Sequence, residues 1–133
     1  MRLYVTQRYS THPSGVDGAY MQAVVRLRAF YELGFAAFSP IVNSHPADIT
    51  TVKGKREPLS PKLYYETDME WLRVSEALVY WEDEYRASVG VKAEVDEARR
   101  LGIPVVMVPA TLKTSRDAAW HVKKTLEKRE EKK

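Results

Sequence analysis

Residues 77–108 read ALVYWEDEYRASVGVKAEVDEARRLGIPVVMV, and this stretch decides the fold. It begins with the apolar run 77–81, typical of a buried strand, and ends with a second strand-like run at 103–108. Between them, apolar residues recur at helical spacing from Val91 to Leu101, and Gly102 is expected to end that helix. A strand, a helix and a second strand in this order predict a parallel β-α-β unit.

The same alternation continues on both sides of this unit. Further strands are expected at 3–5 and 35–38, and further helices at 19–33 and from 115 onward. Asp17 and Ser115 are the expected caps of these two helices, and another helix begins at Ser60 or at Thr67 and runs to about residue 75. Residues 40–61 show no periodicity and are expected to form a polar loop. The pattern predicts an α/β protein with a parallel sheet of four to five strands, which binds ligands at the carboxyl ends of its strands.

The composition limits the classes of function. With 133 residues, a single domain over 1–133 is expected, with a charged, fraying helix end at 123–133. The absence of cysteine excludes disulfides, and the three histidines are too scattered to suggest a metal site. Without an apolar run of about 20 residues or a signal peptide, we expect a cytoplasmic protein that does not bind a membrane. The basic tail lacks interleaved aromatic residues, so nucleic acid is not an expected partner.

Glu94 is a carboxylate on the apolar side of the predicted helix. On a helical wheel it falls between Ala98 and Leu101, while Val91 and Val95 lie on the same arc. A buried carboxylate requires a hydrogen bond, a shifted pKa or a cleft, so Glu94 is a candidate site residue. The structural alternative is that Glu94 lies at the edge of the arc and reaches water.

Asp68 is a second carboxylate in the same situation. On a helical wheel it falls between Trp71 and Leu72, with Tyr64 on the same arc. Two carboxylates in unequal environments can divide the work of cleaving a glycosidic bond, one as an ionised nucleophile and the other as an acid. The structural alternative places Asp68 in the first turn of a helix that begins at Thr67, where its charge complements the helix dipole.

The spacing of these residues is similar to that of a known enzyme family. Three motifs of this sequence resemble those of the nucleoside 2-deoxyribosyltransferase superfamily, and within it those of the 2'-deoxynucleoside 5'-monophosphate N-glycosidases. The motifs are Asp68-x-x-Trp71-Leu72, Ser88-x-Gly90-x-x-x-Glu94-x-x-x-Ala98 and Gly102-x-Pro104-Val105. The resemblance implies a flavodoxin-like (Rossmann-like) three-layer sandwich. It also implies an enzyme that cleaves the N-glycosidic bond of (deoxy)nucleosides or their monophosphates without a metal or other cofactor.

The resemblance further implies roles for individual residues. By position, Glu94 resembles the nucleophile that attacks the anomeric carbon and forms a glycosyl-enzyme. Asp68 resembles the acid that contacts the sugar or assists departure of the base, and Tyr4 resembles the tyrosine that orients the nucleophile. Ser88 resembles the serine with which monophosphate hydrolases contact phosphate, and the helix amino terminus that follows it favours an anion. The other expected substrate-binding residues are Gly90, Arg8, Ser10, Asn43 and His45.

We therefore expect a hydrolase or transferase of nucleotide metabolism that acts on a small nucleotide or nucleoside. The alternative is a non-catalytic nucleotide-binding or sensing module with the same fold. Family members build part of their active site across a subunit boundary, and a small sheet leaves apolar surface to bury. A homodimer or a larger homo-oligomer is therefore expected.

Overall fold

The computed structural model describes residues 1–132 and is organised around a four-stranded sheet. The strands follow the spatial order β2 (Ala36–Phe38), β1 (Arg2–Val5), β5 (Ala77–Trp81) and β6 (Val105–Val108). Each neighbouring pair is parallel. The sheet confirms the predicted α/β class and the flavodoxin-like topology.

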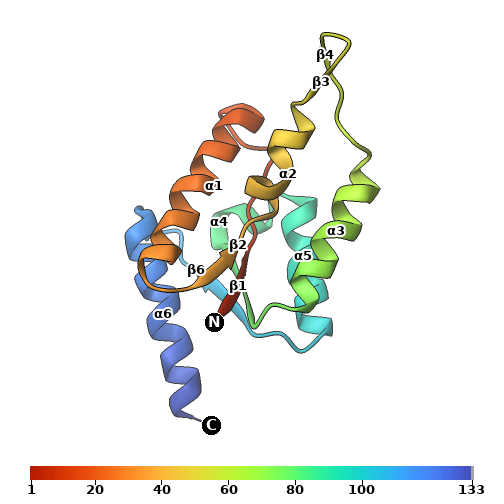
Figure 1. The fold of residues 1–133 in the computed structure, drawn as a ribbon. Helices are drawn as coiled ribbons and strands as arrows, with labels where there is room; N and C mark the ends of the chain where they lie inside the picture. Colours follow the sequence, from red (N-terminus) through yellow and green to blue (C-terminus); the bar gives the residue numbers. More distant parts are fainter. Residues whose placement is uncertain (133) are drawn as a thin grey trace.

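Helices cover both faces of the sheet and complete three layers (Figure 1). One face carries α1 (Gly15–Glu32) and α6 (Ser115–Glu131), and the other carries α3 (Pro61–Arg73) and α5 (Val89–Arg100). Two shorter helices lie nearer the carboxyl ends of the strands. These are α2 (Pro40–Asp48), which packs on α1, and the single turn α4 (Glu82–Tyr85), which follows β5.

Alternating side chains of the strands build the two halves of the core. The whole of β5 is buried, as predicted for a strand at the centre of a parallel sheet. Toward α1 and α6 point Leu3, Val5, Ala77, Val79 and Trp81. Toward α3 and α5 point Tyr4, Leu78 and Tyr80. Tyr4 therefore lies on the same face of the sheet as the helix that carries Glu94.

The prediction of an irregular loop over residues 40–61 is wrong. Residues 40–48 form α2, because Ser39 accepts a hydrogen bond from the Val42 N–H at 3.3 Å and Pro40 occupies the first turn. A hairpin of β3 (Thr51–Val52) and β4 (Lys55–Arg56) follows and projects from the body of the protein (Figure 1). Its turn requires positive φ angles at two successive residues, 52° at Lys53 and 81° at Gly54.

Two of the predicted helix caps are also corrected. The first helix begins before Asp17, with Ser14 as its N-cap, and Asp17 lies in the first turn. The last helix is capped by Thr114, whose hydroxyl accepts from the Asp117 N–H at 3.1 Å, and Ser115 is its first residue. In α3 the Ser60 alternative is confirmed, since its hydroxyl accepts from the Leu63 N–H at 3.4 Å.

The connections of the sheet place a crevice between β1 and β5. The chain leaves β1 toward β2 on one side, whereas β5 pairs with the other side of β1. Adjacent parallel strands whose connections run in opposite directions leave a crevice at their carboxyl ends, where ligands of this fold class bind. No helix within residues 1–132 is long and apolar enough to cross a membrane.

Candidate functional site

A pocket of about 200 Å³ lies at the carboxyl edge of the sheet. Four segments contribute to it: the loop after β1, helix α2, helix α3 and the first turns of α5. Its lining residues are Gln7, Tyr9, Ser10, Pro40, Ile41, Ser44, Asp48, Tyr64, Asp68, Ser88, Gly90, Val91 and Glu94. The pocket thus brings together residues that are up to 87 positions apart in the sequence, from Gln7 to Glu94.

Five of the residues singled out in the sequence line this pocket. They are Glu94, Asp68, Ser88, Gly90 and Ser10. Tyr4 does not line the pocket but lies fully buried beside Glu94, whose charge acts on the Tyr4 hydroxyl.

Asn43 and His45 lie outside the pocket lining. Asn43 is exposed on α2. His45 is buried and both of its ring nitrogens have partners: Nδ1 lies 2.7 Å from the Tyr9 hydroxyl and Nε2 lies 3.1 Å from a carboxylate oxygen of Asp17. Its ring also stacks on Tyr20. These contacts give His45 a structural role in joining α2 to α1.

Arg8 also lies outside the pocket lining, and its backbone connects the site to the other face of the sheet. The Arg8 N–H donates to Glu84 at 3.0 Å, and Glu84 forms a buried ion pair of 2.7 Å with Arg26. The guanidinium of Arg26 lies 3.8 Å from the centre of the Trp81 ring. The loop that enters the pocket is therefore held by a buried polar cluster on the α1 side of the sheet.

Eight lining residues are not among the site residues predicted from the sequence, and three of them are joined by hydrogen bonds. Asp48 ends α2, Tyr9 belongs to the loop after β1, and Tyr64 lies in the first turns of α3. Both phenol hydroxyls donate to Asp48, at 2.8 Å from Tyr9 and at 3.1 Å from Tyr64. In the sequence, Asp48 stands in the segment expected to be a loop, so no periodic pattern indicated its direction. Tyr64 had been assigned to the apolar arc of its helix.

The side chain of Glu94 is half-buried, and its carboxyl group lies close to Thr6, Tyr4 and Asp68. Its Oε2 is sealed from solvent and has no hydrogen-bond partner. Burial raises the pKa of Glu94 to about 8, and the negative charge of Asp68 adds to this rise. The hydroxyls of Thr6 and Tyr4 oppose the rise because they approach the carboxylate as donors. No hydrogen bond of regular geometry reaches the Tyr4 oxygen, so the two groups lie close without being fully paired.

Asp68 is buried, and its pKa is shifted less than that of Glu94. Loss of hydration raises the pKa of Asp68 to about 6. The negative charge of Asp68 favours the protonated form of Glu94, so the pKa of Glu94 is the higher of the two. Tyr4 remains protonated, since burial and the nearby charge of Glu94 raise its pKa well above the ordinary value. The pocket therefore holds an unequal pair of carboxyl groups with a proton donor beside them.

The amino terminus of α5 opens into the same pocket. The Ser88 hydroxyl accepts from the Val91 N–H at 3.2 Å and still has its own proton to donate. By helix geometry, the N–H groups of Val89 and Gly90 have no acceptor within the helix. A methyl group at Gly90 would meet nothing closer than the Ser88 hydroxyl at 3.7 Å, so the glycine leaves open space for a ligand.

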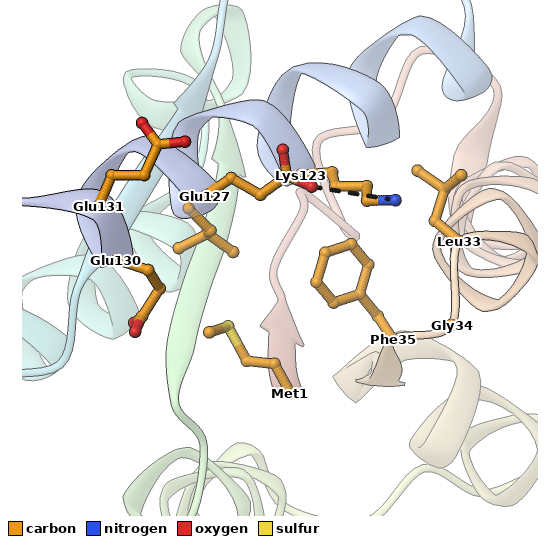
Figure 2. A pocket seen from close by; sticks show the side chains of 9 residues that line it. Met1, Leu33, Gly34, Phe35, Lys123, Glu127, Glu130 and Glu131 are labelled. Atoms are coloured by element: carbon orange, nitrogen blue, oxygen red, sulfur yellow. Dashed lines mark ion pairs between the residues drawn. The ribbon is translucent and has the colours of Figure 1, made fainter.

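A larger hollow, of about 500 Å³, lies at the opposite edge of the sheet. Figure 2 shows its apolar lining of Met1, Leu33 and Phe35 beneath the last turns of α6. The dashed line in Figure 2 marks an ion pair between Lys123 and Glu127, whose charged atoms lie 3.9 Å apart. This hollow lies at the amino ends of the strands, opposite the edge at which ligands of this fold class bind. Within residues 1–132, no three His, Asp or Glu side chains are grouped to hold a metal ion.

Comparison with known proteins agrees with the fold. A family model described as a domain of unknown function (DUF1937) matches residues 2–110. No curated protein matches the sequence. A solved structure of a 2-deoxyribosyltransferase from the psychrotolerant bacterium Bacillus psychrosaccharolyticus has a TM-score of 0.58 and 19% identity, over 85% of this chain and 75% of that one.

A second similar structure is a conserved protein from Enterococcus faecalis V583. It has a TM-score of 0.55 and 18% identity, and the match covers 80% of this chain but 62% of that protein. This chain thus corresponds to less than two thirds of the second protein. At these levels of identity, the two structures establish a nucleoside deoxyribosyltransferase-like fold.

Proposed function

This chain belongs to the DUF1937 family of domains of unknown function, and we propose that it cleaves the N-glycosidic bond of a nucleoside or a nucleoside 5'-monophosphate. The observation that carries the proposal is the pair of Glu94 and Asp68, two carboxyl groups in one pocket with pKa values of about 8 and about 6. Carboxyl groups in unequal environments are the usual means of cleaving glycosidic bonds.

In the proposed reaction, ionised Glu94 attacks the anomeric carbon of the sugar. A bond forms between a Glu94 oxygen and C1', while the bond between C1' and the base nitrogen breaks. The base leaves with the electron pair of that bond and takes a proton from water, since Asp68, with the lower pKa, is ionised when Glu94 is. Water or a second base then attacks C1' and releases Glu94, giving hydrolysis or transfer respectively. Tyr4 supports the ionised form of Glu94 through its protonated hydroxyl.

The charge of the pocket favours the free nucleoside as substrate. Three carboxyl groups line it, those of Asp48, Asp68 and Glu94, and within residues 1–132 no Lys, Arg or His belongs to the lining. A phosphate dianion would be repelled by such a pocket. The opposing feature is the amino terminus of α5 with Ser88, which suits an anion. Both substrate classes therefore belong in the test.

The test is release of free base from a panel of nucleosides and their 5'-monophosphates, with and without a second base as acceptor. We expect release by the unmodified protein and loss of at least about 10²-fold in Glu94→Gln, which keeps the shape of the side chain and removes the nucleophile. The matched control is Glu97→Gln, the same change on the same helix outside the pocket. A glycosyl group retained on the peptide containing Glu94 after acid quench, detected by mass spectrometry, identifies the covalent intermediate.

A non-catalytic nucleotide-binding module is the second candidate. The observation in its favour is that burial holds the pKa of Glu94 at about 8, so that the carboxyl group of the unliganded protein is protonated at neutral pH. A sensor of this kind would bind nucleosides with similar affinity in the unmodified protein and in Glu94→Gln. It would release no base at any pH, which distinguishes it from the enzyme.

A further inference from the structure

Asp48 is the third carboxylate of the pocket and takes no part in the chemistry proposed above. Its two oxygens are each fixed by one neutral donor, Oδ2 by the Tyr9 hydroxyl at 2.8 Å and Oδ1 by the Tyr64 hydroxyl at 3.1 Å. The three residues come from three different segments, so the plane of the carboxylate is held by the loop after β1 and by α3 as well as by α2.

The hydrogen-bonding capacity of Asp48 is not exhausted by these contacts. A carboxylate has about four acceptor positions, two on each oxygen, and the two phenols occupy one on each. One acceptor position therefore remains on each oxygen of the carboxylate. Asp48 lines the pocket, and no cation belongs to the lining in the described part of the chain. The free positions suit a ligand that presents two adjacent hydrogen-bond donors.

The electrostatic pattern separates Asp48 from the catalytic pair. The charge that raises the pKa of Glu94 comes from Asp68, whereas the charge of Asp48 acts on the phenols of Tyr9 and Tyr64 and raises their pKa values. A sugar with its anomeric carbon at Glu94 lies beside Asp68. The part of a nucleoside that reaches Asp48 then lies farther from C1', near Tyr9 and Tyr64, the two aromatic residues of the lining.

From these observations we propose that Asp48 selects the nucleobase, and that it favours a base with two neighbouring N–H donors on one edge. Among the common bases, guanine presents such an edge, with its ring N–H beside its exocyclic amino group. Hypoxanthine lacks the amino group, and adenine and cytosine place a ring nitrogen acceptor beside theirs. This inference rests on the proposed function, because it takes the pocket to be a nucleoside site.

The test is calorimetric titration of the Glu94→Gln variant, which binds without turnover, with guanosine and inosine and with their 2'-deoxy counterparts. The two members of each pair differ by one exocyclic amino group, which would donate a hydrogen bond to Asp48. We expect guanosine to bind at least about tenfold more tightly than inosine, the effect of one hydrogen bond to a charged acceptor. Adding Asp48→Asn should reduce this ratio to less than about threefold, since an amide offers a donor where the carboxylate offered an acceptor.

The matched control is Asp96→Asn, the same change at an exposed residue of α5 outside the pocket lining. It should retain the preference for guanosine. Equal binding of guanosine and inosine to the parent overturns the inference whether or not the Asp48 variant folds. A preference that survives in Asp48→Asn also overturns it, because another residue would be responsible. An equal loss for every nucleoside would assign Asp48 to the sugar, and the absence of any nucleoside binding would overturn the proposed function itself.

Discussion

Glu94 and Asp68 line one pocket, where burial and then the charge of Asp68 raise the pKa of Glu94 to about 8. The removal of that charge in Asp68→Asn should lower the pKa of Glu94, while burial should keep it above the ordinary value of 4.5. Titration of the glutamate side-chain carbons by ¹³C NMR measures both values. An unchanged pKa in the variant would mean that the two groups are not coupled.

The rate of base release should depend on pH through Glu94. Because the attacking form is ionised, kcat/KM should rise with pH through a value near 8 and level off above it. Initial rates between pH 5 and 10, with stability verified at each pH, provide the profile. If the rate falls above pH 8 instead, the last proton of the pair is needed for catalysis and Glu94 is not the ionised attacker.

Glu94→Gln should stabilise the protein in alkaline solution. The folded-state pKa of Glu94 is raised from 4.5 to about 8, so the folded state retains a proton that the unfolded state loses. Stability therefore falls as pH rises from about 4.5 to 8, and the penalty is complete above 8. The glutamine variant avoids it, and should gain on the order of 2 to 4 kcal/mol at pH 9, with little change at pH 5.

Urea unfolding at pH 5 and pH 9 measures this difference. Glu97→Gln is the control, since the hydrogen bond from Arg100 lowers the pKa of Glu97 and the variant should show no alkaline gain. A similar gain in both variants would mean that the effect reflects total charge rather than the buried group.

Gly90→Ala should separate stability from binding. Gly90 lies in the helical turn that opens the pocket, and its replacement by alanine favours the helix by about 0.5 to 1 kcal/mol. The added methyl group occupies the space beside the Ser88 hydroxyl and reduces the room for a ligand. We expect a higher melting temperature together with nucleoside affinity reduced at least about tenfold. Unchanged affinity would place the ligand away from α5.

Ser88 offers a test of substrate charge that preserves the helix. Ser88→Asp keeps an N-cap acceptor for the Val91 N–H, whereas Ser88→Ala loses it and should cost about 1 kcal/mol. The aspartate variant should process free nucleosides and bind 5'-monophosphates more weakly than the parent, because it adds a negative charge beside the helix amino terminus. Competition by monophosphates against nucleoside release measures the effect. Equal competition in parent and variant would argue against a phosphate at this position.

Much of the fold and part of the site could be predicted from the sequence. The strand 77–81 and the helix that carries Glu94 have strong local patterns, and their apolar faces agree with the observed burial. Glu94 and Asp68 stood out because a carboxylate on an apolar arc is uncommon. The pairing of these two residues in one pocket follows from the parallel topology, which brings α3 and α5 to the same face of the sheet.

Residues 40–61 could not be predicted because their structure depends on tertiary contacts. Helix α2 is short and is stabilised by packing on α1 and by the contacts of His45 with Tyr9 and Asp17, neither of which produces a periodic sequence pattern. The same limit applies to Asp48, whose two donors lie 39 and 16 residues away in the sequence. Long-range hydrogen bonds of this kind leave no local signal.

The buried cluster of Arg26, Glu84 and Trp81 has a consequence for how this site tolerates change. Glu84 holds the Arg8 backbone, and with it the loop that forms one wall of the pocket, from the opposite side of the sheet. Loss of either partner of this ion pair leaves a buried charge uncompensated. A genetic screen for loss of function should therefore recover substitutions at Arg26 and Glu84, which do not line the pocket. Among homologues, we expect Arg26 and Glu84 to be retained even where the residues that line the pocket differ.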